Sequence, residues 1–220
     1  MAIMTLRVAA ALGSAMLCLA VIARGQERMP EFGPDGLAGL DQGQKAELVR
    51  GHAVLPEGAV KTTNGTSFIE AALVFDRPPA EVWSLLSKTE LQVHYVPEIK
   101  AANLIWDKGN ENCLELNVRV MGRNVVYRMI QSFDPPQLYF HWVLDAEMPS
   151  DIKELAGFWR FYPYGQDRTL ARYGSIVKPR FPVPGFLRRA IAKGHVRSDL
   201  ESVKKYVDSG GTWRAADKKH

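Results

Sequence analysis

The sequence predicts an α+β fold in which a curved antiparallel sheet of about seven strands surrounds a long C-terminal helix, with two short helices after the first strand. Three observations lead to this prediction. Residues 67–75 form an apolar stretch that ends shortly before two prolines. Six further stretches between residues 99 and 178 alternate apolar and polar residues or are rich in β-branched and aromatic ones. A helical pattern then occupies residues 184–207.

The first strand and the two short helices occupy residues 67–96. Pro78 and Pro79 preset the first helical turn, where a missing backbone N–H costs nothing. The apolar residues that follow fall at helical spacing, with Trp83 beside them, so one face of this helix is apolar. A helix of at most about three turns is not stable alone, so we expect it to pack against the sheet. The second short helix is expected over residues 89–96.

The strands that follow are predicted to form an antiparallel meander, because turn residues separate them. The alternation is clearest over residues 114–120, where leucine and valine alternate with charged and polar residues. One face of the sheet is therefore expected to meet solvent and the other to be covered. The predicted strands cover residues 99–107, 113–121, 124–132, 138–145, 157–162 and 169–178, and residues 145–154 are expected to form a solvated acidic loop.

The closing helix carries apolar residues on two sides. Leu187 and Ile191 share one side of an ideal helix, whereas Leu200 and Val203 lie near the opposite side. A straight helix cannot bury both sets against one sheet. Either the helix bends or breaks near Gly194, or its first half faces a ligand, a membrane or a partner.

The N-terminal residues predict export. Arg7 precedes an uncharged run, residues 8–23, that is typical of a secretory signal peptide and ends in residues suited to cleavage. We therefore assign residues 1–23 to a signal peptide and expect a periplasmic or secreted protein. The alternative is a membrane anchor formed by uncleaved residues 8–23, although these 16 residues fall short of the roughly 20 that span a bilayer.

The remaining chain divides into three parts. Residues 24–65 are rich in Gly, Pro and acidic residues in their first half and predict a linker or N-terminal extension, with a short helix over residues 42–50. Residues 66–208 are assigned to one globular domain, and residues 209–220 to a basic disordered tail. Once the leader is removed, Cys113 is the remaining cysteine, which excludes an internal disulfide and predicts a packing role.

Charge and histidine spacing exclude several classes of function. The formal net charge is +4, and the basic residues are not interleaved with aromatic ones on one face, so no nucleic-acid partner is expected. The five histidines form no His-x-His or His-Glu-x-x-His pattern, so we expect no metal and no cofactor. Arg160 and Arg172 are expected on the solvated face; a buried guanidinium would require a carboxylate or an anionic ligand head. We expect a monomer.

Residues 66–208 resemble the START-like (SRPBCC) superfamily, whose members share the helix-grip fold and include polyketide cyclase/dehydrase-like proteins, coenzyme-Q-binding START proteins and birch-pollen-allergen-type ligand carriers. The resemblance is carried by "VFDRPPAEVWSLLSKTELQVHYVPEIKAANLI" (74–105), which has an apolar strand, Pro-x-x-x-Trp, a short helix and Tyr/Phe-x-Pro in order. The closing helix "PGFLRRAIAKGHVRSDLESVKKYV" (184–207) supports it. The resemblance implies an apolar ligand held between sheet and helix, where only some members catalyse reactions.

We therefore expect an exported, non-catalytic binding or transfer protein for an apolar ligand such as a lipid, quinone, sterol-like or polyketide-like molecule. Affinity would come from burial, at about 25 cal/mol per Å² of apolar surface, and one or two polar groups would fix the ligand head. The residues expected to line the cavity are Trp83, Tyr95, Trp106, Leu116, Val118, Tyr127, Met129, Trp142, Trp159, Leu187 and Ile191.

Two alternatives remain open. A cyclase or dehydratase-like enzyme would use His94, Tyr95 or His141 as acid or base, because a neutral imidazole near pH 7 can move a proton from a carbon acid. Tyr127 and Arg172 are weaker candidates for the same role. The other alternative is a scaffold whose own aromatic side chains fill the cavity.

Residues 178–189 predict contact with a membrane surface. Phe181, Val183 and Phe186 stand between basic residues that include Arg188 and Arg189. Apolar tips flanked by cations suit insertion at an anionic lipid surface. The alternative is a loop folded back on the core.

Overall fold

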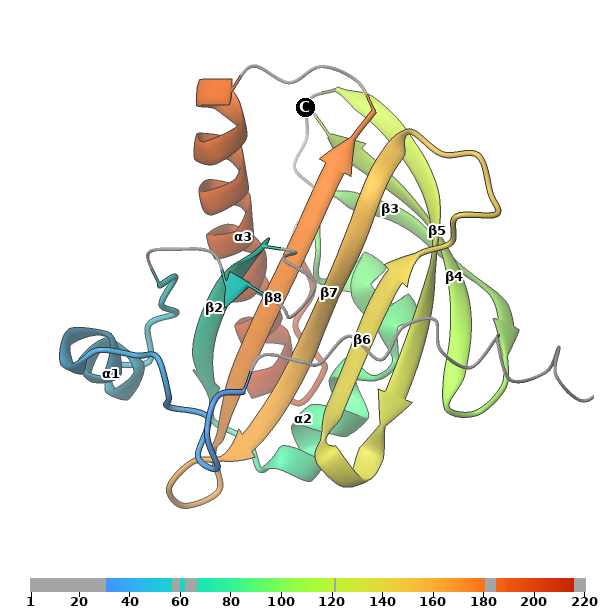
Figure 1. The fold of residues 1–220 in the computed structure, drawn as a ribbon. Helices are drawn as coiled ribbons and strands as arrows, with labels where there is room; N and C mark the ends of the chain where they lie inside the picture. The colour runs from blue at the N-terminus through green and yellow to red at the C-terminus, as the bar shows by residue number, and fades with distance from the viewer. Residues whose placement is uncertain (1–30, 57–59, 62–66, 121, 181–184, 216–220) are drawn as a thin grey trace, which may run out of the picture.

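The structure, a computed structural model, confirms the α+β helix-grip architecture. A curved antiparallel sheet wraps around one face of the C-terminal helix, and short helices close one end (Figure 1). The structure describes residues 31–56, 60–61, 67–120, 122–180 and 185–215; of these, residues 60–61, 67 and 185–195 are described by their backbone alone. Among the helices in these ranges, none is both long and apolar enough to cross a membrane.

The sheet has seven long strands and the two-residue strand β1, in the spatial order β1-β2-β8-β7-β6-β5-β4-β3. Every neighbouring pair of strands except β2 and β8 is also consecutive in the sequence, so the predicted meander is confirmed. The first long strand, β2, pairs with the last strand, β8. β7 begins at Ile152, five residues before the predicted start at residue 157, because Ile152 and Leu155 are buried in the core. The strands are β1 (Val60–Lys61), β2 (Ser67–Phe75), β3 (Ile99–Asp107), β4 (Glu111–Val120), β5 (Arg123–Asp134), β6 (Tyr139–Leu144), β7 (Ile152–Pro163) and β8 (Thr169–Pro179).

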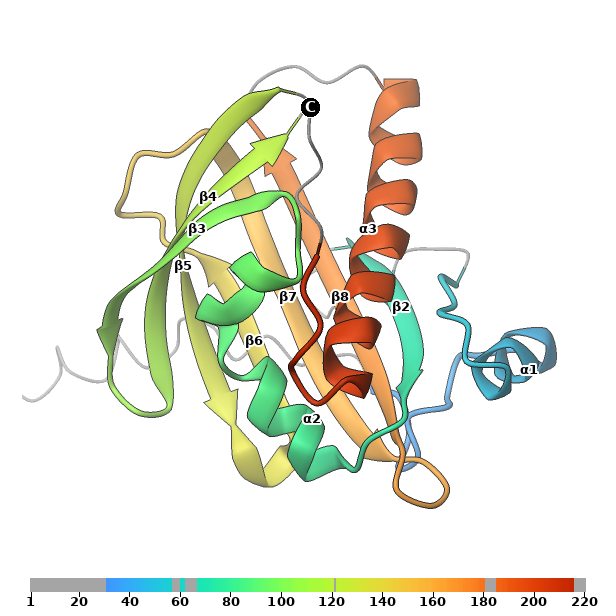
Figure 2. The same cartoon turned by 180° about the vertical axis from the view of Figure 1, so that it is seen from behind.

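The long helix α3 lies on the concave side of the sheet and is unbroken (Figure 2). A break near Gly194, one of the alternatives considered for the two apolar sides of this helix, is therefore absent. Its second half buries Leu200, Val203 and Val207 in the main core. The side chains of its first half lie outside the described part of the chain. The helices are α1 (Gln42–Val49), α2 (Pro79–Leu86), η1 (Thr89–His94, 3-10), η2 (Pro135–Gln137, 3-10) and α3 (Gly185–Asp208).

Trp83 of α2 packs against one end of the sheet. Its indole makes edge-to-face contacts with Phe133, Phe140 and Phe161, with ring centroids 6.4, 5.9 and 6.4 Å away. These rings come from β5, β6 and β7, so one side chain of a short helix joins three strands. This burial is what stabilises α2, which is too short to persist alone.

The turn between β2 and α2 is bound to the C-terminus of α3. The backbone N–H of Asp76 donates to the Asp208 carboxylate at 2.9 Å, and Arg77 donates to the Asp208 carbonyl oxygen. Lys204 Nζ donates to the Val74 carbonyl at 2.7 Å and forms ion pairs with Asp76 and Asp208. Because the last carbonyls of a helix lack partners within it, these contacts cap α3 and fix its position on the sheet.

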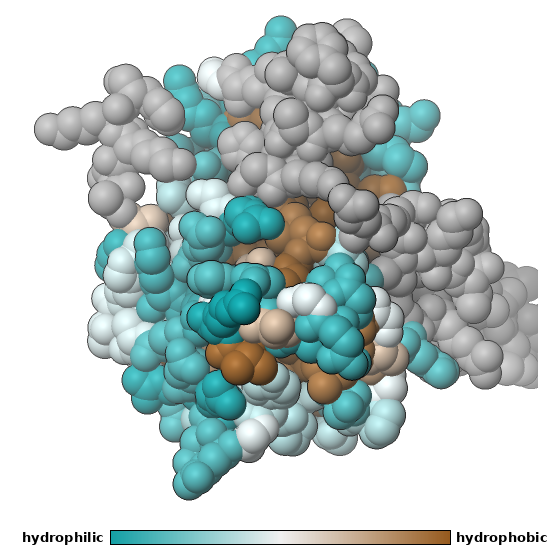
Figure 3. All heavy atoms as spheres, turned by 90° about the vertical axis from the view of Figure 1, so that its left-hand side faces the viewer, coloured by the Kyte–Doolittle hydropathy of each residue, from teal (hydrophilic) through white to brown (hydrophobic). Residues whose placement is uncertain are grey.

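Residues 31–56 cover part of the convex face of the sheet, so this part of the predicted linker or extension is a packed extension. Phe32, Leu40 and Leu48 are buried against β2, β7 and β8, and Val54 pairs with Ala72 of β2. The expected short helix is present as α1, whose first turn is closed by a capping box of Asp41 and Gln44. Figure 3 shows the side on which α1 and α3 lie: it is largely polar, with apolar side chains reaching the surface near its centre.

A buried ion pair lies beneath this segment. Arg172 of β8 is 1% exposed and pairs with Glu70 of β2, which is 5% exposed. Arg172 Nη1 also donates to the carbonyl oxygens of Gly36 (2.7 Å) and Ala38 (3.0 Å), and the guanidinium lies 3.9 Å from the ring centroid of Phe32. Burial lowers the pKa of Arg172 to about 10, so it stays charged at neutral pH. The expectation of a solvated Arg172 is wrong.

The described part of the C-terminal tail is ordered, which corrects the expectation of disorder for residues 209–215. Gly210 and Gly211, with φ of 67° and 80°, end α3 in the left-handed conformation typical of a helix C-terminus. Trp213 then packs on the main core, and the Ala215 N–H donates to the His94 carbonyl oxygen at 2.9 Å. The chain end is thereby bound to η1.

Candidate functional site

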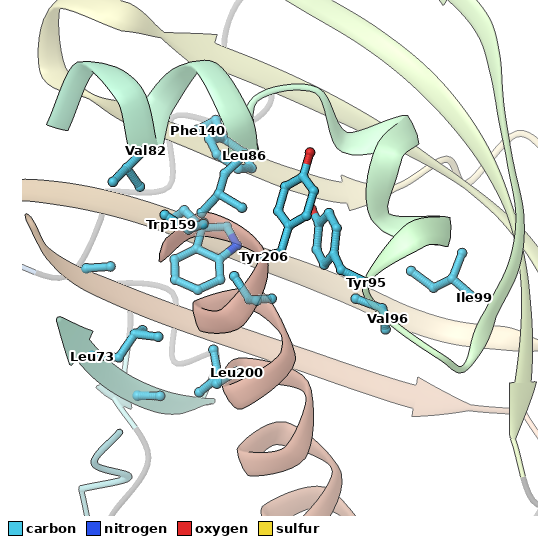
Figure 4. Packing of buried hydrophobic residues seen from close by; sticks show 14 of the residues in the cluster. Leu73, Val82, Leu86, Tyr95, Val96, Ile99, Phe140, Trp159, Leu200 and Tyr206 are labelled. Carbon is cyan, nitrogen blue, oxygen red and sulfur yellow. The ribbon is translucent and has the colours of Figure 1, made fainter. Parts of the chain in front are cut away.

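A cavity of about 210 Å³ lies between the concave face of the sheet, α2, η1 and the second half of α3. Figure 4 shows residues of this region: Leu86, Phe140 and Trp159 come from α2, β6 and β7, and Tyr95 is the residue that follows η1. Most of the wall is apolar or aromatic. Seven of the residues expected to line the cavity do so: Tyr95, Leu116, Val118, Tyr127, Met129, Trp142 and Trp159.

Strand alternation places these side chains. Leu116 of β4 pairs with Tyr127 of β5, and Leu114 pairs with Met129, so all four project from the same face. Side chains one residue along the strands project from the other face. The alternation that was evident in the sequence therefore predicted the wall formed by these two strands.

Trp106 and Trp83 do not line the cavity, contrary to expectation. A β-bulge between Leu104 and Trp106 shifts the register, so Trp106 pairs with Cys113 on the convex face. There Lys108 Nζ lies 4.5 Å from its ring centroid. Trp83 is enclosed by the phenylalanines described above. Leu187 and Ile191 belong to the side chains outside the described part.

Several polar groups of the wall were not predicted. Thr89 and Gln131 are each 1% exposed, and Thr89 Oγ1 donates to Gln131 Oε1 at 2.5 Å. Gln131 is in phase with Tyr127 and Met129 along β5, so extending the alternation by one step would have placed it in the cavity. The other polar wall residues missing from the prediction are Gln92, Glu98, Tyr173, Ser175 and Asp199.

The tyrosines of the cavity are protonated donors at neutral pH. Tyr95 stacks on Tyr206 of α3 with ring centroids 4.2 Å apart. Burial raises the pKa of Tyr95 and of Tyr127 well above the ordinary value, and it raises the pKa of Tyr173 to about 12. Such phenols are poor bases, because the charged form is disfavoured in the cavity.

The raised pKa of Tyr173 predicts sensitivity to alkali. The folded state holds this proton up to about pH 12, whereas the unfolded state releases it near pH 10. The contribution of Tyr173 to stability is therefore complete below pH 10 and is lost as pH rises toward 12. Urea unfolding at about pH 9 and about pH 11 should show a loss that Tyr173→Phe reduces. Ionisation of all seven tyrosines near pH 10 without loss of structure would contradict this.

The two histidines considered as acid or base lie away from the cavity. His94 is exposed at the end of η1. His141 pairs with Phe158, whose ring belongs to the convex-face cluster, and stacks on Tyr139 with centroids 5.5 Å apart. Of the expected acid–base set, Tyr95 and Tyr127 line the cavity, both with raised pKa.

Cys113 lies apart from the cavity described above. Cys113 is buried on the convex side of β4, and burial raises the pKa of its thiol, which makes it a weak nucleophile. Among the described residues, no group of three or more His, Cys, Asp and Glu is arranged to hold a metal ion. A more open hollow of about 510 Å³ lies at the opposite end of the sheet from α2 and is lined by Arg123, Asn124, Val125, Asp151 and Arg180.

Gly157 makes room for Trp142 in the cavity wall. The two residues pair across β6 and β7, and a Cβ on Gly157 would overlap the indole and lie 2.7 Å from the Gly174 carbonyl oxygen. We expect Gly157→Ala to push the indole into the cavity, to weaken ligand binding about tenfold or more and to cost about 1–3 kcal/mol. Calorimetric titration and urea unfolding would measure these effects.

Gly174→Ala provides the matched control for this substitution. A Cβ on Gly174 would overlap the ring of Phe158 on the convex face, outside the cavity. It should therefore lower stability comparably while leaving ligand affinity unchanged. Equal losses of affinity in both variants would show that Trp142 does not control the cavity.

The comparison with known families agrees with this fold, which is that of START-like proteins. Residues 75–204, more than half of the chain, match the family described as "Polyketide cyclase / dehydrase and lipid transport". The chain belongs to this family. Among curated protein sequences, none matches the chain.

Solved structures show the same fold at low sequence identity. The chain is similar to TTHA0849 from Thermus thermophilus (19% identity, TM-score 0.56, 66% of this chain and 96% of that one). It is also similar to a STAR-related lipid transfer protein fragment from Xanthomonas axonopodis (13%, 0.56, 70% and 98%). A third is the ZhuI aromatase/cyclase from Streptomyces sp. R1128 (14%, 0.54, 64% and 93%).

Proposed function

We propose that the protein is an exported, non-catalytic binding or transfer protein for an apolar ligand held between the sheet and α3. The ligand class is a lipid, quinone, sterol-like or polyketide-like molecule. The observation that carries the proposal is the cavity, whose wall combines aromatic rings with a few polar groups, as is typical of small-molecule sites. The family description names lipid transport beside polyketide cyclase and dehydrase, so it supports an apolar ligand for either function.

The size of the cavity bears on how a ligand is held. Its volume of about 210 Å³ is below the roughly 300–1,000 Å³ of sites for drug-sized molecules. A larger ligand therefore places one ring or head group in this space and passes outward, or the walls move apart around it. Trp142 and Trp159, both in the wall, offer flat apolar surfaces for such a group.

The positions of the acid–base candidates favour a carrier over an enzyme. His94 and His141 lie away from the cavity, and Tyr95 has a raised pKa. The cyclase or dehydratase alternative would instead depend on Glu98 or Asp199, both of which are among the residues that line the cavity. A carrier returns its ligand unaltered, whereas either enzyme would change the ligand's mass or bonding.

Native mass spectrometry of the full chain, expressed with its leader and purified without detergent, tests the proposal. We expect one apolar molecule per chain, and solvent extraction after prolonged incubation should return it chemically unchanged. A molecule that loses water or cyclises during incubation would establish the enzyme. A chain that carries no molecule and binds no apolar probe would overturn the binding function and favour a scaffold with a filled cavity.

Export is proposed from the leader-like residues 8–23. Cell fractionation should find the protein in the periplasm or medium, with a mass that corresponds to cleavage near residue 23. A chain of full mass in the membrane fraction would instead support the uncleaved anchor.

Transient membrane contact is proposed for residues 178–189, which include the first residues of α3. Phe181, Val183 and Phe186 are flanked by Arg188 and Arg189; the placement of these side chains lies outside the described part of the chain. We expect the double variant Phe181→Asp, Phe186→Asp to bind anionic vesicles at least about tenfold more weakly. Unchanged vesicle binding would overturn this contact.

A further inference from the structure

The side-chain amide of Gln131 stands out in the cavity wall because it is polar, buried and only half satisfied. Gln131 lies on β5 and is 1% exposed. Its Oε1 accepts the hydrogen bond from Thr89 Oγ1 at 2.5 Å, which holds the amide in one orientation. In the described part of the chain, Nε2 has no hydrogen-bond partner.

The surroundings of this amide make the missing acceptor costly. Met129 and Phe140 line the same wall, and Trp142 is the cross-strand partner of Gln131. A buried N–H without a partner costs about 1–3 kcal/mol. Because Nε2 is itself fully buried, a ligand acceptor reaches it when the walls move apart around the ligand, and the hydrogen bond then removes this cost.

We infer that Gln131 is a specificity-determining residue whose Nε2 donates a hydrogen bond to a neutral acceptor, a carbonyl or ether oxygen, on the bound apolar ligand. This inference rests on the proposed function. One amide donor, held by Thr89, satisfies a neutral oxygen. It does not offset the cost of burying a carboxylate, which requires a cation or several donors. Among the described residues that line the cavity there is no Arg, Lys or His, and the acidic Glu98 and Asp199 stand in the same wall, which disfavours a second negative charge there.

A pair of probes with one ring skeleton tests the inference. 1-Tetralone and tetralin differ by one carbonyl group, and Trp142 and Trp159 in the cavity wall report binding of either by fluorescence. The full chain should bind 1-tetralone about 5–10-fold more tightly than tetralin, the effect of one buried hydrogen bond. Gln131→Met should abolish this preference while binding tetralin at least as tightly.

Gln137→Met is the matched control. Gln137 is an exposed glutamine in η2, six positions along the chain from Gln131 and away from the cavity wall. The same chemical change there should leave the ratio of the two affinities unaltered. The ratio, rather than either affinity alone, separates a direct hydrogen bond from a general loss of packing.

The outcomes distinguish the inference from the function on which it rests. Equal binding of both probes to the wild-type chain, or a preference that persists in Gln131→Met, would overturn the role of Gln131 while leaving the carrier intact. Binding of neither probe would overturn both. If Gln131→Met does not fold, 15N-glutamine spectra of the wild-type chain decide: 1-tetralone should shift the Gln131 side-chain signals and tetralin should not, whereas equal shifts would refute the hydrogen bond.

Discussion

Deletion of residues 31–56 should prevent the remaining domain from folding. This segment buries Phe32, Leu40 and Leu48 against the convex face of the sheet. Its removal would expose a contiguous apolar surface on β2, β7 and β8 and leave the ion pair of Glu70 and Arg172 uncovered. We expect an aggregated or unfolded product by size-exclusion chromatography and circular dichroism, although the family match begins only at residue 75.

A chain that lacks only residues 1–23 is the control and should unfold cooperatively. The deletion variant would contradict the prediction if it gave a sharp thermal transition within a few degrees of this control. Such a result would mean that the domain folds without residues 31–56 and that this segment is not part of its core.

Arg172→Leu should cost about 3–5 kcal/mol of unfolding free energy. The substitution leaves Glu70 as a buried carboxylate without its cation, and it leaves the carbonyl oxygens of Gly36 and Ala38 without their donor. Urea denaturation at neutral pH measures the loss. Part of it should be recovered in the double variant Glu70→Leu, Arg172→Leu, because the uncompensated charge is then gone.

Arg128→Leu provides a matched control on the same sheet. Arg128 Nε lies 2.9 Å from Glu115 Oε2 across β5 and β4, and both side chains are about 30% exposed. Solvent screens this pair, so its loss should cost at most about 1 kcal/mol. Similar costs for the two arginine variants would show that the Arg172 pair is not buried in solution.

Most of the sheet was predictable from the sequence because alternation is a local signal. The bounds expected for β2 and β3 agree with the structure, and β8 differs by one residue. The bulge in β3 was not predictable in the same way. It depends on how the edge strand fits β4, and it turns Trp106 away from the cavity although its sequence position suggested the opposite.

The packing of residues 31–56 carried no periodic signal. Phe32, Leu40 and Leu48 are separated by glycines and polar residues, and their burial depends on a complementary surface formed by three distant strands. Local composition therefore resembled a linker. Tertiary contacts, which local patterns do not encode, decide the structure of this segment.

The cavity was predicted better for its apolar wall than for its polar groups. Leu116, Met129 and the other alternating residues follow from strand periodicity, whereas a glutamine within such a strand interrupts the pattern. The position of Gln131 next to Thr89 requires the three-dimensional approach of η1 to β5. The polar residues that we infer to select a ligand were thus the hardest to predict from the sequence.

The docking of the N-terminal segment sets an order for synthesis and transport. Arg172 donates to the carbonyl of Gly36 across 136 positions of the chain, and β2 likewise pairs only with β8 among the long strands. Until β8 emerges from the ribosome or the export channel, neither the convex face nor the first strand has its native neighbour. The part of the chain that emerges first is therefore among the last to reach its place, and nascent chains that stop short of β8 should depend on chaperones for solubility.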